Sequence, residues 1–305
     1  MKLKKKGLLI IGCLMILLIA IFYLIYPGDW DVSVLQIVKC NSNAAFRSIG
    51  DTAVWKKWWP GGEVDGYTYK TERKEYPEIG VVLEGERPIP GTIHILRLAG
   101  RDSTAVLWKM HFSAGTDPVS RIREHLRSRS WQQRGHVVLD SLRRFLETSG
   151  NIYKMEVRMQ MSTDSALIMT QLSTGHYPST GEIYEQIRGM RRFIGVRGIG
   201  ETDPPMLHVV KVNDSSYRSM IAIPIDRALQ EAGPYNGRRF VPWKVMIGEV
   251  RGGASRAEEG MMELQNYISD YQYTIMAIPF ESLVTERDQE RDSSRWITRV
   301  VVPVP

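Results

Sequence analysis

Cysteine is nearly absent from this sequence, which has two in 305 residues, Cys13 and Cys40. Cys13 lies inside an apolar run and Cys40 lies in the first predicted domain, so no disulfide is expected between them. A disulfide scaffold is thereby excluded. With 43% hydrophobic and 24% charged residues, the chain is also neither collagen-like nor largely disordered. The sequence predicts a globular protein held together by its own cores.

Signatures of catalysis and metal binding are also missing. The six histidines stand at 94, 111, 125, 136, 176 and 208, so none are three to five residues apart, as a helical metal pair requires. The sequence has no G-x-S-x-G, P-loop or G-x-G-x-x-G motif, and the glycines of Gly195 to Gly200 are differently spaced. We therefore predict no catalytic residue, no metal ligand and no cofactor.

A large excess of charge of one sign is lacking as well. The net charge is +6, and Lys2, Lys4, Lys5 and Lys6 supply four of these charges before the first acidic residue. The remainder of the chain therefore has a net charge of only +2. Composition gives no support for a nucleic-acid partner.

Residues 7–26 form an uncharged, apolar run of 20 residues, which as a helix would be about 30 Å long and match the hydrocarbon thickness of a bilayer. KLKKK precedes this run, whereas the twenty residues after it contain one lysine, Lys39. The positive-inside bias predicts a cytoplasmic tail and transmembrane anchor over residues 1–27. We expect a single-pass protein of the bacterial inner (cytoplasmic) membrane whose soluble domains are extracytoplasmic, in the periplasm where a second membrane exists.

Two alternatives exist for this segment. A cleaved signal peptide would have an apolar core of about 7–15 residues and a small-x-small cleavage site, and neither is found. Ile10 to Cys13 resembles a bacterial lipobox, but the apolar run continues for thirteen residues after the cysteine. An uncleaved anchor is the preferred interpretation.

Residues 30–149 are predicted to contain a strand, two short helices, several antiparallel strands and a long helix over residues 118–147. Thr92 to Leu98 and Thr104 to Phe112 alternate as the strands of a half-buried hairpin. The long helix, with a possible interruption near Gly135, contains seven arginines and two acids between Val119 and Leu146. Such a charge run fits either a solvated face or a surface for anionic lipid head groups.

This order of elements, with NSNAAFRSIGDTAVWKKWWP at residues 41–60, resembles the START-like (polyketide-cyclase-like) superfamily. The resemblance implies a helix-grip fold in which a curved sheet wraps the long helix around an apolar cavity. It makes Trp108 a candidate cavity residue and Arg97 a candidate anchor for an acidic head group. The alternative is a filled core, with Arg97 extending to solvent at a strand end.

Residues 151–305 repeat themselves. Ser179 and Ser255 each open a capping-box pattern and lie 76 residues apart, and the prolines of IAIPI (221–225) and VVVPV (300–304) lie 79 apart. The near-constant offset predicts a duplicated strand-helix-strand-strand unit. The fold class predicted for the whole chain is therefore α+β, with a transmembrane helix, a START-like domain and this duplicated domain.

The duplication and the two closing strands resemble the GyrI-like fold, the effector-binding domain of AraC-type and MerR-type regulators. The resemblance implies a groove between the halves that binds small organic molecules, often apolar cations, at an acidic residue. Phe280 to Leu283 matches the family's Glu-x-Tyr with Glu281, but Leu283 replaces the tyrosine.

Glu281 lies in a mostly apolar stretch, so desolvation would raise the pKa of its carboxyl group unless a cation compensates. It is either a ligand-facing carboxylate or an edge-strand residue paired with an arginine such as Arg287. Four further residues are candidates for the groove, each with an ordinary core role as its alternative: His208, Trp243, Tyr177 and Tyr184.

The predicted function is noncatalytic binding or sensing of small hydrophobic or amphipathic molecules, cations included, at the extracytoplasmic membrane face. One alternative is a hydrolase that uses Glu281, with Tyr177 in place of the missing tyrosine. Another is an interaction protein with closed cores and no pocket. The sequence indicates no particular protein partner.

Overall fold

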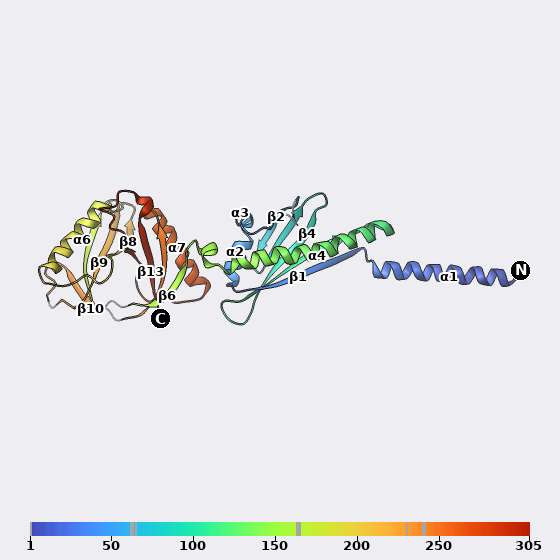
Figure 1. The fold of residues 1–305 in the computed structure, drawn as a ribbon, viewed down its shortest axis with the longest axis horizontal. Coiled ribbons are helices and arrows are strands. Elements are labelled where there is room, and N and C mark those ends of the chain that lie inside the picture. The colour runs from blue at the N-terminus through green and yellow to red at the C-terminus, as the bar shows by residue number, and fades with distance from the viewer. Residues whose placement is uncertain (1, 62–63, 65, 163–165, 230, 240–241) are drawn as a thin grey trace. The chain divides into compact units, whose positions relative to one another are not determined.

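The structure, a computed structural model, describes the 305 residues except 1, 62–63, 65, 163–165, 230 and 240–241 (Figure 1). It divides into two compact units, residues 1–148 and 149–305. Each unit combines helices with one sheet, and all the strand pairs described are antiparallel. The predicted α+β class is confirmed.

The apolar run at the N-terminus forms a helix, α1 (Lys2–Ile25). Within the part of the chain that the structure describes, no helix has the length and apolarity needed to cross a bilayer. The prediction of a transmembrane segment at residues 7–26 is therefore not supported by the structure.

The first unit contains a five-stranded sheet and a long helix that runs along it (Figure 1). The strand order is β1 (Asp29–Val38), β5 (Thr104–Ser113), β4 (Ile89–Arg97), β3 (Glu78–Glu84) and β2 (Thr68–Glu75). Two short helices, α2 (Ser42–Ile49) and α3 (Thr52–Trp55), follow β1 and begin at the side-chain caps Asn41 and Asp51. The long helix is α4 (Pro118–Leu146), capped by Asp117.

Gly135 brings α4 close to the sheet. A Cβ atom at this position would lie 2.9 Å from Cγ2 of Val34 on β1 and 3.2 Å from Cε of Met110 on β5. The helix is continuous through Gly135, so the interruption considered there is absent. The glycine permits close packing against the sheet and does not break the helix.

The second unit is built on one eight-stranded sheet. Its strand order is β10 (Asn236–Arg239), β7 (Ala166–Thr174), β9 (Ser216–Ile225), β8 (Met206–Asn213), β12 (Phe280–Leu283), β13 (Ile297–Val304), β11 (Lys244–Arg251) and β6 (Val157–Met161). A short helix, α5 (Ser149–Tyr153), precedes β6.

The predicted duplication is present in this sheet. The first copy is β7, α6 (Thr180–Gly195), β8 and β9, and the second is β11, α7 (Ala254–Asp270), β12 and β13. The copies meet where β8 pairs with β12, a seam at which Leu207 faces Glu281 and Met206 faces Ser282. The edge strands are exchanged between the copies. Strand β6 precedes the first copy in the sequence but pairs with β11 of the second, and β10 precedes the second copy but pairs with β7 of the first.

The two helices of the duplication begin differently. Helix α6 begins at Ser179 with the predicted capping box, in which Ser179 and Glu182 satisfy each other's backbone N–H groups. Helix α7 begins after Gly253 without a side-chain cap, so the prediction that Ser255 caps it was wrong. Here Gly252 has a φ of +134° and its N–H donates to the carbonyl of Trp296, which fixes the chain before the helix.

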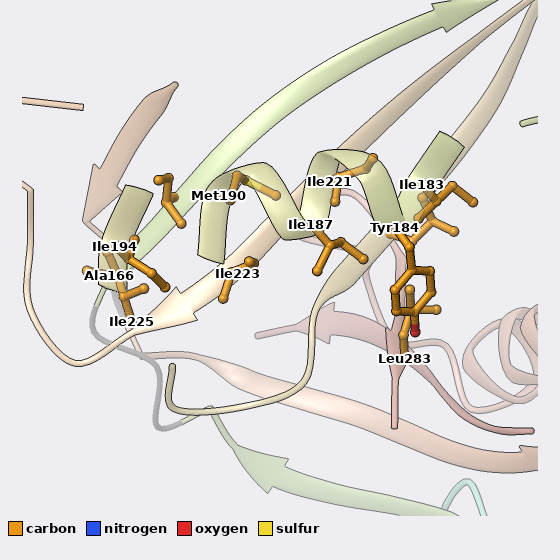
Figure 2. Close-up of a cluster of buried hydrophobic side chains, with 12 residues drawn as sticks. Ala166, Ile183, Tyr184, Ile187, Met190, Ile194, Ile221, Ile223, Ile225 and Leu283 are labelled. Atoms are coloured by element: carbon orange, nitrogen blue, oxygen red, sulfur yellow. The ribbon is translucent and has the colours of Figure 1, made fainter. Parts of the chain in front are cut away.

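Helices α6 and α7 cover one face of the second sheet. Residues of α6 at helical spacing, among them Ile183, Ile187 and Met190, pack on alternate residues of β7 and β9 such as Ile221 and Ile223 (Figure 2). Helix α7 packs in the same way on β11 and β13. The strand residues between these positions point to the opposite face.

Gly135→Leu should destabilise the first unit by about 1–3 kcal/mol, because the new side chain would have to displace Val34 and Met110. Gln132→Leu, at an exposed position of the same helix, should change stability by less than about 0.5 kcal/mol. Denaturant unfolding of both variants measures the difference. Equal stabilities would show that α4 does not pack this closely.

Candidate functional site

The face of the second sheet opposite its helices contains a pocket of about 330 Å³. Its walls come from β7, β8, β9 and β12, whose register places alternate side chains on this face. Most of the lining is apolar, as in Leu167, Met169, Met206, Met220, Ala222 and Phe280. Three of these are methionines, whose unbranched, polarisable side chains adapt to ligands of different shape.

Two residues predicted for the groove, His208 and Trp243, line this pocket. His208 lies opposite Met220 in the pairing of β8 with β9. Desolvation lowers the pKa of its imidazole, and a hydrogen bond to the carbonyl of Pro279 only partly offsets this. His208 is therefore neutral at neutral pH and offers a polar but uncharged contact.

The charge at the pocket is positive. Arg238 and Arg239 on β10 contribute to the lining, and no carboxylate among the described residues does so. Arg238 pairs with Leu167 and therefore shares the pocket face, whereas Arg239 pairs with Ala166, which belongs to the core under α6. Arg238 is exposed and makes no ion pair with a described residue, so its guanidinium is available to a ligand at the rim.

Glu281 lies on the other face of the sheet. It faces Leu207 and Val300, both of which belong to the cores under the helices. Desolvation raises the pKa of the Glu281 carboxyl group, and the neighbouring Arg287 lowers it by less. Oε2 of Glu281 accepts a hydrogen bond from Nη2 of Arg287 at 3.2 Å. The structure thus contains the pair with Arg287, but β12 lies between β8 and β13, so Glu281 is not on an edge strand.

Arg287 is itself deeply buried, with 5% of its side chain exposed. Its Nη2 also donates to Oγ1 of Thr298 at 2.7 Å, and its guanidinium lies 5.1 Å from the ring centroid of Trp296. A carboxylate, a hydroxyl and an aromatic ring therefore surround one internal cation.

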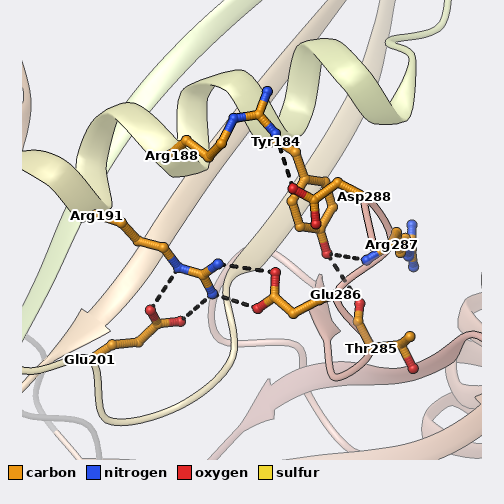
Figure 3. Close-up of polar contacts among 8 residues, drawn as sticks. All are labelled: Tyr184, Arg188, Arg191, Glu201, Thr285, Glu286, Arg287 and Asp288. Carbon is orange, nitrogen blue, oxygen red and sulfur yellow. Dashed lines mark hydrogen bonds and ion pairs between the residues drawn. The ribbon is translucent and has the colours of Figure 1, made fainter. Parts of the chain in front are cut away.

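Helix α6 holds the segment that contains Arg287 in place (Figure 3). The Tyr184 hydroxyl donates to the carbonyl of Thr285 and accepts from the N–H of Arg287. Arg188 pairs with Asp288. Tyr184 is 1% exposed, so this groove candidate is a core residue that positions the 285–288 segment.

Arg191 completes this attachment. Its guanidinium donates to the carboxylates of both Glu201 and Glu286 (Figure 3). These hydrogen bonds raise the pKa of Arg191 and keep it charged at any physiological pH. The helix of the first copy is thereby tied to the β12–β13 connection of the second.

Tyr177 lies near Glu281 but not in the pocket. Desolvation raises the pKa of its hydroxyl, and the charge of Glu281 raises it further. Its ring contacts Tyr217 edge-on, with 5.9 Å between centroids. No hydrogen bond joins Tyr177 to Glu281 among the described residues, so the acid-base pair considered from the sequence is not assembled here.

The two candidates in the first unit are a core residue and a surface residue. Trp108 is 1% exposed within the core, and Arg97 is exposed at the end of β4. Neither lines the arginine-rich cleft beside α4 or the cavity next to Trp59 and Tyr69 in this unit. At Gly135 helix α4 packs directly against Val34 and Met110, as the filled-core alternative expects at this position.

The sequence interpretation missed the methionines of the pocket, although a signal for them exists. Ala166 to Met169 and Met220 to Ile225 are apolar at every position rather than at alternate ones. Such runs are typical of strands covered on both faces. The helices α6 and α7 cover only one face of the sheet. The apolar residues between the core positions therefore lie on the other face, where they form the pocket.

No protein-family model matches the chain, and no curated protein matches it. The chain is similar to the solved C-terminal domain of EcmrR, with 12% identity, a TM-score of 0.43, and coverage of 50% of this chain and 98% of that one. It is also similar to SAV2435 bound to tetraphenylphosphonium, at 18% identity, a TM-score of 0.34, and coverage of 50% and 94%. A START superfamily protein from Mycobacterium smegmatis matches at 14% identity with a TM-score of 0.32, and coverage of 38% and 97%. At this level of likeness none of these proteins indicates what the present chain binds.

Arg287→Met should destabilise the second unit by about 3–5 kcal/mol at neutral pH, because it leaves the Glu281 carboxylate buried without its cation. The loss should be smaller at about pH 5 than at about pH 8. Without Arg287 the folded-state pKa of Glu281 rises further above its unfolded value, so stability is greatest at low pH and is lost as pH rises through the folded pKa.

Denaturant unfolding at several pH values measures this dependence. The double variant Glu281→Gln with Arg287→Met removes both charges and should recover most of the stability. A pH-independent loss in Arg287→Met, equal to that of the double variant, would contradict the pairing.

Proposed function

We propose that the second unit binds small apolar or amphipathic molecules without chemical conversion, in the pocket on the open face of its sheet. The observation that carries this proposal is the pocket itself, whose volume of about 330 Å³ lies at the lower end for small-molecule sites. Burial of ligand surface against its methionines and Phe280 would supply affinity at about 25 cal/mol per Å² of apolar area.

The charges at the pocket favour a neutral or anionic ligand over a cation. Arg238 lies at the rim, and the described lining contains no carboxylate. The carboxylate expected to attract cations, Glu281, is engaged by Arg287 on the other face. An apolar tail in the pocket with an anionic head group at Arg238 satisfies both the apolar surface and the arginine.

We further propose, on the sequence alone, that residues 7–26 hold the protein in the bacterial inner membrane with both units on its extracytoplasmic side. The support is the uncharged run and the lysines that precede it. The ligand would then be captured from the periplasm or from the outer surface of the membrane.

Octanoate, octanol and octyltrimethylammonium have the same chain and differ in head-group charge, so they test both the pocket and its polarity. In the full chain labelled with ¹³C-methyl methionine, octanoate and octanol should shift the signals of Met169 and Met206, and octyltrimethylammonium should bind more weakly. The signal of Met261 on α7 should stay unchanged, because this residue lies on the other face.

Met220→Glu should weaken octanol binding about tenfold or more, because it places a charge in the apolar pocket. Val210→Glu introduces the same charge at an exposed position of β8 outside the pocket and should leave binding unchanged. Met169 and Met206 signals that respond to none of the three compounds would refute the proposed function. A stronger response to the cation would refute the proposed polarity alone.

The membrane proposal has a separate test. The full chain should remain with the membrane fraction after an alkaline carbonate wash, whereas a chain lacking residues 2–26 should be released. Recovery of the full chain in the soluble fraction would show that the N-terminal helix is not an anchor. It would leave the proposed ligand pocket unaffected.

A further inference from the structure

The first unit contains a cleft rich in arginine, beside the first half of α4. Its volume is about 340 Å³. Tyr67 and the β3–β4 connection form one side, and α4 forms the other. The cleft is lined by Tyr67, Arg87, Arg123, Arg127, Trp131 and Arg134, with Glu86, Glu124 and Ser130.

The helical repeat explains why these side chains gather. Arg123, Arg127 and Arg134 are separated by four and seven residues, so they project from one side of α4. Trp131, four residues after Arg127, lies on the same side and is completely buried. The cleft therefore has an aromatic base and cationic walls.

Glu124 organises two of the four arginines. Its side chain is 7% exposed and pairs with the guanidinium groups of both Arg87 and Arg127. Arg127 also donates to the backbone carbonyl of Arg87. One buried carboxylate thus holds two guanidinium groups side by side before any ligand arrives.

Two arginines remain for a ligand. Neither Arg123 nor Arg134 forms an ion pair with a described residue, and the guanidinium of Arg134 lies 5.4 Å from the ring centroid of Trp131. The lining contains four arginines and two glutamates, which leaves an excess of two positive charges. An anion with two charges or several oxygens would complete the site.

We propose that this cleft binds a phosphoryl group, either as free phosphate or as the head group of an anionic lipid. Phosphate oxygens match the planar fork of guanidinium donors and can engage several arginines together. The cleft exceeds the size of one phosphate, so it also accommodates the glycerol part of a lipid head group. This site is independent of the apolar pocket of the second unit.

Isothermal titration of the full chain tests this site, with inorganic phosphate and with dihexanoyl phosphatidylglycerol as probes. At least one of the two probes should bind, and its affinity should fall with added sodium chloride because the interaction is ionic. Arg123→Gln combined with Arg134→Gln should weaken binding about tenfold or more, since it removes charged donors while the Glu124 pairs remain. Arg129→Gln, at an exposed position of α4 outside the cleft, is the matched control and should bind as wild type does.

The two probes separate the sources of the phosphoryl group. Binding of phosphate as strongly as of the lipid identifies a free anion, and binding of the lipid alone identifies a head group. Arg123→Glu should abolish binding of either probe and, as an exposed substitution, should leave the unfolding midpoint close to that of wild type. Absence of binding by both probes, or equal loss in Arg129→Gln, would overturn the proposal.

Discussion

The buried guanidinium of Arg287 organises the side-chain contacts on the helix side of the seam in the second unit. It lies against the seam between the two copies, where it neutralises Glu281, bonds Thr298 and covers Trp296. A charge in such a position is tolerated only because each neighbour compensates part of its desolvation. The chain's own cation thus occupies the space beside Glu281 on the helix side of the seam, whereas the proposed ligand pocket lies on the opposite face.

The same segment joins the copies. Strands β8 and β12 share only two residue pairs, so the seam alone is a narrow connection. Helix α6 of the first copy binds residues 285–288, which lie in the second copy, through Tyr184, Arg188 and Arg191. The strands β10 and β6 form the two edges of the sheet that contains both copies. The pocket therefore lies where the two copies are held together by several sets of contacts. Such contacts favour a pocket that is already formed before a ligand binds.

Much of the fold follows from local sequence patterns. The capping box at Ser179 and the alternation in β4 and β5 depend on neighbouring residues, the repeat offset requires only a comparison of the chain with itself, and the structure contains all three features. The candidate site was harder to predict from the sequence than the fold. Alternation assigns the residues of a strand to two faces, but it does not show which face the helices cover. Glu281 illustrates this limit, because the sequence allowed either a ligand-facing carboxylate or a carboxylate paired with an arginine. The pair forms because the turn after β12 brings Arg287 to Glu281, and the sequence alone does not show this turn.

The exchange of edge strands has a consequence for synthesis of the chain. Met161 of β6 pairs with Lys244 of β11, so the ribosome must add more than eighty residues before β6 meets its partner. At about 5–20 residues per second, β6 waits several seconds with its backbone groups unpaired. Strand β10, by contrast, emerges after β7 and can pair at once. Until β11 arrives, the backbone groups of β6 are open to unwanted strand pairing, and the exposed methionines Met159 and Met161 add apolar surface there.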